Sequence, residues 1–182
     1  MKKRSLLLLF SAAVIAICTS CGGKSQVSPR VPIWDDAECS KSVSLSSKNV
    51  IVPFERTSDL AQVQISLNGV PFNMWWDTGA SMTCISALEL QKLAKEGKIE
   101  LDDYQGSVVS RIADGSTSES LVFNIKEIFI QGRDNQYLIL HDVAAAVSPN
   151  TGAPLLIGQN IIQNLPRHVF HEDEGVIVFE QQ

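Results

Sequence analysis

A hairpin pattern in the first half of the sequence is the feature that most limits how this chain can fold. Apolar and polar residues alternate over residues 63–67, Asn68-Gly69 follows at once, and an apolar run returns over residues 70–76. Alternation with a period of two is typical of a strand with one buried face, and Asn-Gly is the strongest signal for a two-residue turn. The sequence therefore predicts a β-hairpin whose second strand ends directly before Asp77.

The rest of the chain has the pattern of short strands with one clear helix. Ser86 and Glu89 form a capping box at the start of a helix that Gly97 ends. The other predicted elements are strands at residues 106–113, 116–130, 137–147, 154–158, 168–170 and 176–179, and a short helix at 159–165 that Pro166 stops. The predicted fold class is therefore all-β with one or two short helices, in one domain over residues 48–182.

Asp77 is the residue whose position most needs a chemical explanation. A carboxylate at the end of a buried strand loses hydration, which is costly unless hydrogen bonds or a shared proton compensate. Thr78 and Gly79 follow it and favour a tight backbone turn. One interpretation is that Asp77 forms an Asx-type turn of purely structural value. The other is that Asp77 shares a proton with a second group, which would give this acid a chemical role.

The first residues predict export. A basic start, Met1 to Arg4, precedes an apolar run too short to span a bilayer, which is the pattern of a signal peptide over residues 1–20. Cys21 then lies in a stretch that resembles a bacterial lipobox, so we expect a lipid on Cys21 that anchors the chain to a membrane. Ordinary signal-peptidase cleavage is the alternative. Residues 21–47 have the composition of a flexible tether, and the expected location is the bacterial cell envelope, as a periplasmic or surface lipoprotein.

Charge and cysteine content narrow the range of partners. The chain has 15 basic and 20 acidic residues, and its basic leader leaves the remainder more acidic still, so nucleic acid is not an expected partner. Once Cys18 has left with the leader and Cys21 is acylated, Cys39 and Cys84 remain. An oxidising compartment permits a disulfide between these two cysteines, but their spacing gives no support for one.

Two other kinds of site are less consistent with the sequence. His168, His171 and Glu172 are of the types that bind metals, but histidines beside an acidic turn usually form a solvated surface. No metal or other cofactor is therefore expected. Ser81 and Ser86 have no evident histidine partner, which argues against a nucleophilic serine.

Two motifs give the chain a resemblance to the retropepsin-like aspartic proteases, most closely to small bacterial members exported as single-domain proteins. The motif Asp-Thr-Gly-Ala at residues 77–80 is similar to the catalytic loop of that family. The motif at residues 156–162, two apolar residues and a glycine before a helix start, is similar to the turn that packs beside this loop. The resemblance covers about residues 48–180 and implies the family's all-β half-barrel.

The resemblance also implies roles for individual residues. Asp77 would be the catalytic acid, Thr78 would hydrogen-bond to the opposite loop, and Gly79 would offer its backbone N–H. The other implied site residues are Ala80 in the active-site loop, Gly158 in the supporting turn, and Asp114 and Gly115 at the tip of a substrate-covering flap.

The chain has one Asp-Thr-Gly sequence, whereas a carboxylate pair needs two equivalent loops. We therefore expect a homodimer in which Asp77 lies beside its own copy, with residues 76–81 and the strand at 176–179 in the seam between the chains. The expected function is aspartic endopeptidase activity on peptides or proteins of the cell envelope. The alternative is a catalytically silent scaffold of the same fold that binds extended peptides.

Overall fold

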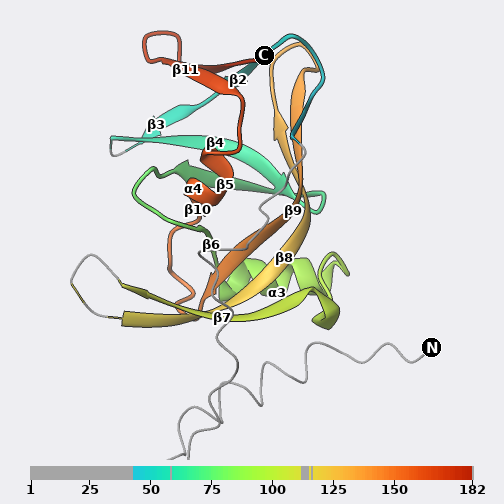
Figure 1. Cartoon of the computed structure of the whole chain (residues 1–182), viewed down its shortest axis with the longest axis vertical. Helices are drawn as coiled ribbons and strands as arrows, with labels where there is room; N and C mark the ends of the chain where they lie inside the picture. The colour runs from blue at the N-terminus through green and yellow to red at the C-terminus, as the bar shows by residue number, and fades with distance from the viewer. Residues whose placement is uncertain (1–42, 58, 112–114, 116, 182) are drawn as a thin grey trace, which may run out of the picture.

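The computed structural model describes residues 43–57, 59–111, 115 and 117–181 (Figure 1). Cys21, the predicted signal peptide and most of the predicted tether lie outside these residues. The strands are β1 (Val43–Leu45), β2 (Asn49–Pro53), β3 (Glu55–Thr57), β4 (Leu60–Leu67), β5 (Val70–Trp76), β6 (Thr83–Ser86), β7 (Tyr104–Arg111), β8 (Thr117–Gln131), β9 (Tyr137–Ser148), β10 (Leu156–Ile157), β11 (Arg167–His171) and β12 (Val176–Glu180). The helices are α3 (Ala87–Lys95) and α4 (Gln159–Ile162), with a 3₁₀ turn, η1, at Leu101–Asp103.

Most of the strands belong to one curved sheet. Its order is β1-β9-β6-β10-β5-β4-β8-β7, β3 pairs with β4, and β8 also pairs with β9. Because β8 pairs with both β4 and β9, the strands between them close around a common core. The second sheet, β11-β12-β2, lies at one end of the first (Figure 1). The all-β fold class with short helices is confirmed.

The predicted hairpin forms between β4 and β5, with Leu67 opposite Val70. Asn68 has a φ of 49° and Gly69 a φ of 86°. A two-residue turn of this kind needs positive φ at both positions, which glycine adopts without strain and asparagine tolerates. Every second residue of β4 is buried, so the alternation seen in the sequence does mark one face directed to the core.

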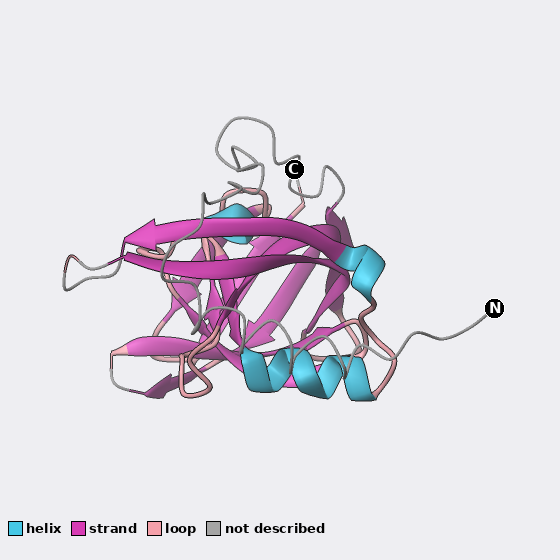
Figure 2. Cartoon of the chain, turned by 90° about the horizontal axis from the view of Figure 1, so that it is seen from below, coloured by secondary structure: helices cyan, strands magenta, loops and turns pink. Residues whose placement is uncertain are grey.

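Helix α3 begins and ends where the sequence predicts. The Ser86 backbone N–H donates to Glu89 Oε2 at 3.1 Å, which completes the capping box. Gly97, with a φ of 66°, follows the end of the helix, and Leu90 and Leu93 are fully buried. Figure 2 shows α3 and the β7–β8 hairpin on opposite sides of the molecule. Among the described residues, no helix is long and apolar enough to cross a membrane.

The folded part begins earlier than the predicted boundary at residue 48. β1 pairs antiparallel with β9, and both Val43 and Leu45 pack against the core. Residues 43–45 therefore belong to the sheet and not to the predicted tether. Two apolar side chains on alternate residues are enough for a short strand to pair at the edge of an existing sheet. In the sequence, serines surround these two residues, so the strand pattern is too short to be recognised.

Candidate active site

Asp77 follows the end of strand β5, where the backbone is held in place by neighbouring residues. The Asp77 backbone N–H donates to the Ile157 carbonyl of β10 at 3.1 Å. The preceding Trp76 is buried, and its ring packs against the rings of His168 and Phe170 at centroid distances of 5.3 and 5.7 Å. Asp77 itself is only partly buried. The backbone before the carboxylate is therefore held by a sheet and an aromatic cluster, while the carboxylate is accessible.

The residues after Asp77 turn tightly around its carboxylate. The Gly79 N–H donates to Asp77 Oδ1 at 2.8 Å, and the Ala80 N–H donates to the Asp77 carbonyl at 3.3 Å. A Cβ on Gly79 would lie 3.2 Å from Asp77 Oδ1, so a side chain there would crowd the carboxylate. Within the described residues, neither Asp77 Oδ2 nor the Thr78 hydroxyl has a hydrogen-bond partner. The Asx-type bond of the structural interpretation is thus present, and it leaves the second carboxylate oxygen available.

The structure places Gly158 directly against this loop. A Cβ on Gly158 would lie 2.3 Å from the carbonyl carbon of Met82, a distance that excludes any side chain. The Gly158 N–H donates to Thr83 Oγ1 at 3.3 Å, and the next N–H, of Gln159, donates to the Ala80 carbonyl at 2.8 Å. The glycine turn therefore supports the loop by close backbone contact, which only a residue without a Cβ permits.

The side chains of Gln159 and Asn160 also hold the loop, and the sequence did not reveal this role. Asn160 Oδ1 accepts from the Thr83 N–H at 2.7 Å and from Thr83 Oγ1 at 3.0 Å, while its Nδ2 donates to the Ala144 carbonyl at 2.8 Å. Gln159 Nε2 donates to the Thr78 carbonyl at 2.8 Å. The only sequence signal was a pair of side-chain amides directly after the supporting glycine.

The β7–β8 hairpin lies beside the same loop. Val108 and Val122 of the hairpin form a small apolar cluster with Ala146, against which Met82 packs. The end of β7 and the start of β8 lie on the same side of Figure 1 as the β5–β6 loop. Gly115, expected at the flap tip, is exposed and has a φ of 86°. Its predicted neighbour Asp114 lies outside the described residues.

The side chains considered as metal ligands or as a disulfide partner have other contacts or are buried in the structure. The Glu172 carboxylate pairs with the Arg56 guanidinium, whose Nε lies 3.0 Å from Glu172 Oε2. His168 Nδ1 lies 2.9 Å from the Pro166 carbonyl. Within the described residues, no three His, Cys, Asp or Glu side chains come close enough together to hold a metal ion. Within the described residues, which do not include Cys39, Cys84 is a free thiol whose pKa is raised, chiefly by burial.

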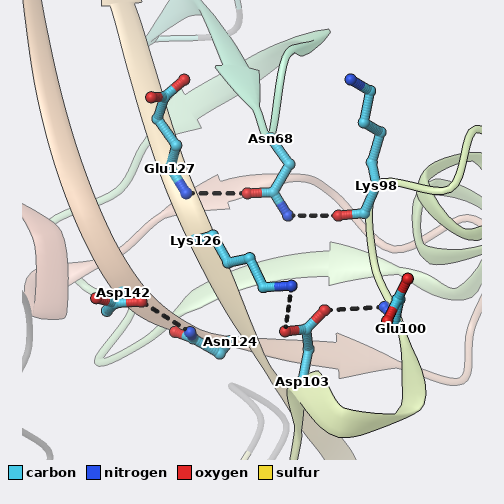
Figure 3. A network of polar contacts seen from close by, with 8 residues as sticks. All are labelled: Asn68, Lys98, Glu100, Asp103, Asn124, Lys126, Glu127 and Asp142. Atoms are coloured by element: carbon cyan, nitrogen blue, oxygen red, sulfur yellow. Dashed lines mark hydrogen bonds and ion pairs between the residues drawn. The ribbon is translucent and has the colours of Figure 1, made fainter.

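A polar network at the other end of β5 is shown in Figure 3. Asn68 Oδ1 accepts from the Glu127 N–H at 2.9 Å, and Asn68 Nδ2 donates to the Lys98 carbonyl at 2.8 Å. The Lys126 ammonium pairs with the buried Asp103 carboxylate at 3.0 Å, and this hydrogen bond is the main cause of the raised pKa of Lys126. The Asn68 contacts join the turn to β8 and to the segment after α3, and the Lys126–Asp103 pair joins β8 to η1.

Comparison with known proteins gives the family of the chain. The sequence profile described as gag-polyprotein putative aspartyl protease matches residues 63–164, which is more than half of the chain and includes the second part of β4, the Asp77 loop and α4. Among solved structures, the chain is similar to a retropepsin-like aspartic protease from Rickettsia conorii, with 14% identity, a TM-score of 0.49 and coverage of 75% of this chain and 91% of that chain. Comparison with curated proteins gives no significant match. The chain belongs to the gag-polyprotein aspartyl protease family, which confirms the resemblance drawn from its motifs.

Proposed function

We propose that this chain is an aspartic endopeptidase whose Asp77 acts together with the Asp77 of a second chain. The observation that carries the proposal is the state of the Asp77 carboxylate. One oxygen is held by the Gly79 N–H at 2.8 Å, and the other has no hydrogen-bond partner within the described residues. This arrangement occurs in a chain that belongs to an aspartyl protease family.

The proposed reaction needs two carboxyl groups in different protonation states. The ionised carboxylate takes a proton from water as the water oxygen attacks the peptide carbonyl carbon, and the protonated partner gives its proton to the carbonyl oxygen. The first carboxyl then gives the proton that it took from water to the amide nitrogen as the C–N bond breaks, and the partner carboxylate takes a proton back from a hydroxyl of the tetrahedral intermediate. Two carboxylates in contact share one proton because like charges at that distance resist double ionisation, so the pair titrates as a unit.

Within one chain, the described residues offer no second acid in an equivalent loop. Asp103 is paired with Lys126, and the Asp142 carboxylate accepts from Asn124 Nδ2 at 3.0 Å. A two-fold homodimer places Asp77 beside its own copy with no further component. The exposed Thr78 hydroxyl is then available to bond across the seam.

The free edges of the sheets support a seam at β11. β12 pairs with β11 on one side and β2 on the other, so its backbone is already satisfied. The outer edge of β2 is covered, because the Arg133 N–H donates to the Ile51 carbonyl at 2.8 Å and the Ile51 N–H donates to Gln136 Oε1 at 2.9 Å. β11 has no second neighbour among the described strands. We therefore place backbone pairing at β11 and not at the strand 176–179 expected from the sequence.

The side chains of β11 link this edge to the candidate active site. On the inner face, His168 and Phe170 contact Trp76, the residue directly before Asp77. On the outer face, Val169 is 40% exposed and lies opposite Val178 in the sheet register. Pairing of two β11 strands would therefore bring the two Asp77 loops toward the same seam and cover an exposed valine.

The test of the dyad uses the full chain with Cys21→Ser, which removes the expected lipid attachment. Wild-type and Asp77→Asn forms are incubated with a denatured protein mixture, and cleavage products are measured. The wild type should cleave and Asp77→Asn should remain at background, because Asn keeps the shape and removes the acid. If neither form cleaves while both bind extended peptides equally well, the silent scaffold is the correct alternative.

The test of the dimer uses concentration and mixing. Specific activity should rise with protein concentration until the dimer saturates. An excess of Asp77→Asn should suppress wild-type activity below simple dilution, because wild-type chains become trapped in dimers with one acid. Val169→Lys should weaken the dimer about tenfold, since an edge lysine discourages strand pairing. Leu88→Lys, at a site 51% exposed on α3, is the matched control. Flat specific activity without suppression would contradict the dimer.

We also propose that the chain is exported and anchored through a lipid on Cys21, and that it acts on peptide segments in the cell envelope. The support is the basic and apolar leader followed by the lipobox-like stretch. Anchoring confines chains to a surface and raises their effective concentration, so a weak dimer is sufficient there. Labelling cells with a fatty-acid analogue should mark the wild-type chain and leave Cys21→Ser unlabelled.

A further inference from the structure

One peptide group connects Gln159 to the carboxylate of Asp77. The Gln159 Nε2 amide donates to the Thr78 carbonyl oxygen at 2.8 Å. The N–H of that same peptide group belongs to Gly79 and donates to Asp77 Oδ1 at 2.8 Å. The two hydrogen bonds therefore form a continuous chain from a side chain of α4, through the Thr78–Gly79 peptide, to the carboxylate.

From this geometry we infer that Gln159 is a positioning residue, which orients and polarises the Thr78–Gly79 peptide so that its N–H holds Asp77 for the reaction. A donor on a peptide carbonyl strengthens the N–H of the same peptide as a donor, because hydrogen bonds in a chain polarise one another. A donor on the carbonyl also opposes rotation of the peptide, which would take the N–H away from Asp77. The inference rests on the proposed function of Asp77.

The backbone of Gln159 is held in place by hydrogen bonds and close packing. Its own N–H donates to the Ala80 carbonyl at 2.8 Å, and the N–H of Asn160 donates to the Ser81 carbonyl at 3.2 Å. The preceding Gly158 is in close contact with Met82. Since the atom opposite Gln159 is a carbonyl oxygen, only the amide nitrogen can face it favourably, which settles the orientation of the amide.

Few titratable groups surround this hydrogen-bond chain. β10 and α4, which pack against the loop, contain none, and β6 contributes Cys84. β11 contributes His168, whose ring contacts Trp76. On the two strands of the neighbouring hairpin, Arg111 and Glu119 lie nearest the turn, and Tyr104, Lys126 and Glu127 lie farther along the strands. A pH effect that appears only when residue 159 is made acidic can therefore be assigned to that residue.

The test compares Gln159→Met, Gln159→Glu and two control variants, Gln163→Met and Gln163→Glu, in the full chain. Gln163 is exposed at the end of the same helix, and its side chain makes no hydrogen bond within the described residues. Gln159→Met should lower kcat about three- to tenfold with little change in KM, the effect of one ordinary hydrogen bond. In NMR spectra, the Gly79 amide proton should move upfield in Gln159→Met and stay in place in the controls.

Gln159→Glu adds a readout that a general loss of stability would not produce. At neutral pH the ionised side chain repels the Thr78 carbonyl, and the variant should lose at least as much activity as Gln159→Met. As the pH falls toward about 4, the carboxyl group takes up a proton and becomes a donor again. The ratio of its rate to the wild-type rate should therefore rise at low pH, whereas the ratio for Gln159→Met should stay flat.

The outcomes separate this inference from the proposed function. If the wild type is no more active than Asp77→Asn but the Gly79 amide responds to Gln159→Met, the positioning contact stands and the proposed function fails. If the wild type is active and Gln159→Met matches Gln163→Met in rate, the inference is overturned, whether or not the Gly79 amide moves. A Gln159→Glu rate ratio that does not rise at low pH would overturn it as well.

Discussion

The polar residues at the two ends of strand β5 differ in how many of their side-chain hydrogen bonds are made. At the start of the strand, Asn68 uses both side-chain atoms, with Oδ1 accepting from Glu127 and Nδ2 donating to Lys98 (Figure 3). At the end of the strand, Asp77 uses one carboxylate oxygen for Gly79 and leaves the other without a partner in the described part of the chain. Both residues form turns, but only the second keeps an unused acceptor on an accessible acid.

This difference separates a structural role from a chemical one. A polar side chain with all of its hydrogen bonds made contributes to stability and has nothing left to offer a ligand. A carboxylate with a free oxygen contributes less to stability and remains available for proton transfer. Variants at the two ends of β5 should therefore change different measurements.

The largest effect is expected at the Asp77 end. Asp77→Asn should lower peptide cleavage about 10²- to 10⁴-fold, the range for loss of a general acid or base. It should change the free energy of unfolding by less than about 0.5 kcal/mol, because the amide oxygen of Asn still accepts from the Gly79 N–H. Cleavage assays and urea unfolding on the same preparation measure both. A large loss of stability would place Asp77 with Asn68 as a structural residue.

The support of the Asp77 loop should be sensitive to a single methyl group. Gly158→Ala should destabilise the protein by about 3 kcal/mol, because the added Cβ would lie 2.3 Å from the Met82 carbonyl carbon and the loop must shift. Gly152→Ala is the control, since its Cβ would meet only Asn150 Oδ1 at 3.6 Å. Thermal unfolding measures both variants, and equal melting temperatures would show that the loop does not depend on this contact.

Removal of Asn68 tests the other end of the strand. Asn68→Ala leaves the Glu127 N–H and the Lys98 carbonyl without their partner and should cost about 1–3 kcal/mol of stability. The kcat of the folded fraction should not change. Asn73→Ala, on the exposed face of β5, should stay near the wild type in both measurements. A drop in kcat for Asn68→Ala at full folding would remove the distinction between the two ends.

The smallest effect is expected for the ion pair beside Asn68. Lys126→Met should cost about 1 kcal/mol at neutral pH, because Lys126 is largely exposed although its partner Asp103 is buried. The folded state raises the pKa of Lys126, so the contribution is fully present below the ordinary lysine pKa of about 10.4. It should be lost as the pH rises through the higher folded-state pKa. Unfolding at pH 7 and at about pH 11 measures this, with Lys48→Met as the control; a pH-independent difference would argue against the pair.

Local signals in the sequence were sufficient for much of this fold. The turn at Asn68-Gly69 and the capping box at Ser86 each depend on residues within a few positions of one another. Turn geometry and helix capping are short-range effects, so their residue types predict them directly. The Asp-Thr-Gly loop belongs to the same class, because the Gly79 to Asp77 bond spans two residues.

Long-range pairing could not be derived in this way. The membership of β1 in the large sheet depends on β9, almost a hundred residues later, and the central position of β12 depends on β2 at the other end of the folded part. Neither β1 nor β12 has a sequence pattern that predicts which strand it pairs with. The predicted start of the domain therefore left out β1, and the seam of the proposed dimer stays a prediction.

The sequence by itself determined the family, the hairpin that ends at Asp77 and the residue types of the loop, because these follow from motifs and short-range turn chemistry. Only the tertiary structure decided that the Gln159 amide reaches the Thr78 carbonyl, since these residues are 81 positions apart. The fold brings them together by placing β10 parallel to β5, so that α4 begins beside the Asp77 loop. The role of Gln159 depends on which residues lie near it in space, and a local sequence pattern does not specify these residues.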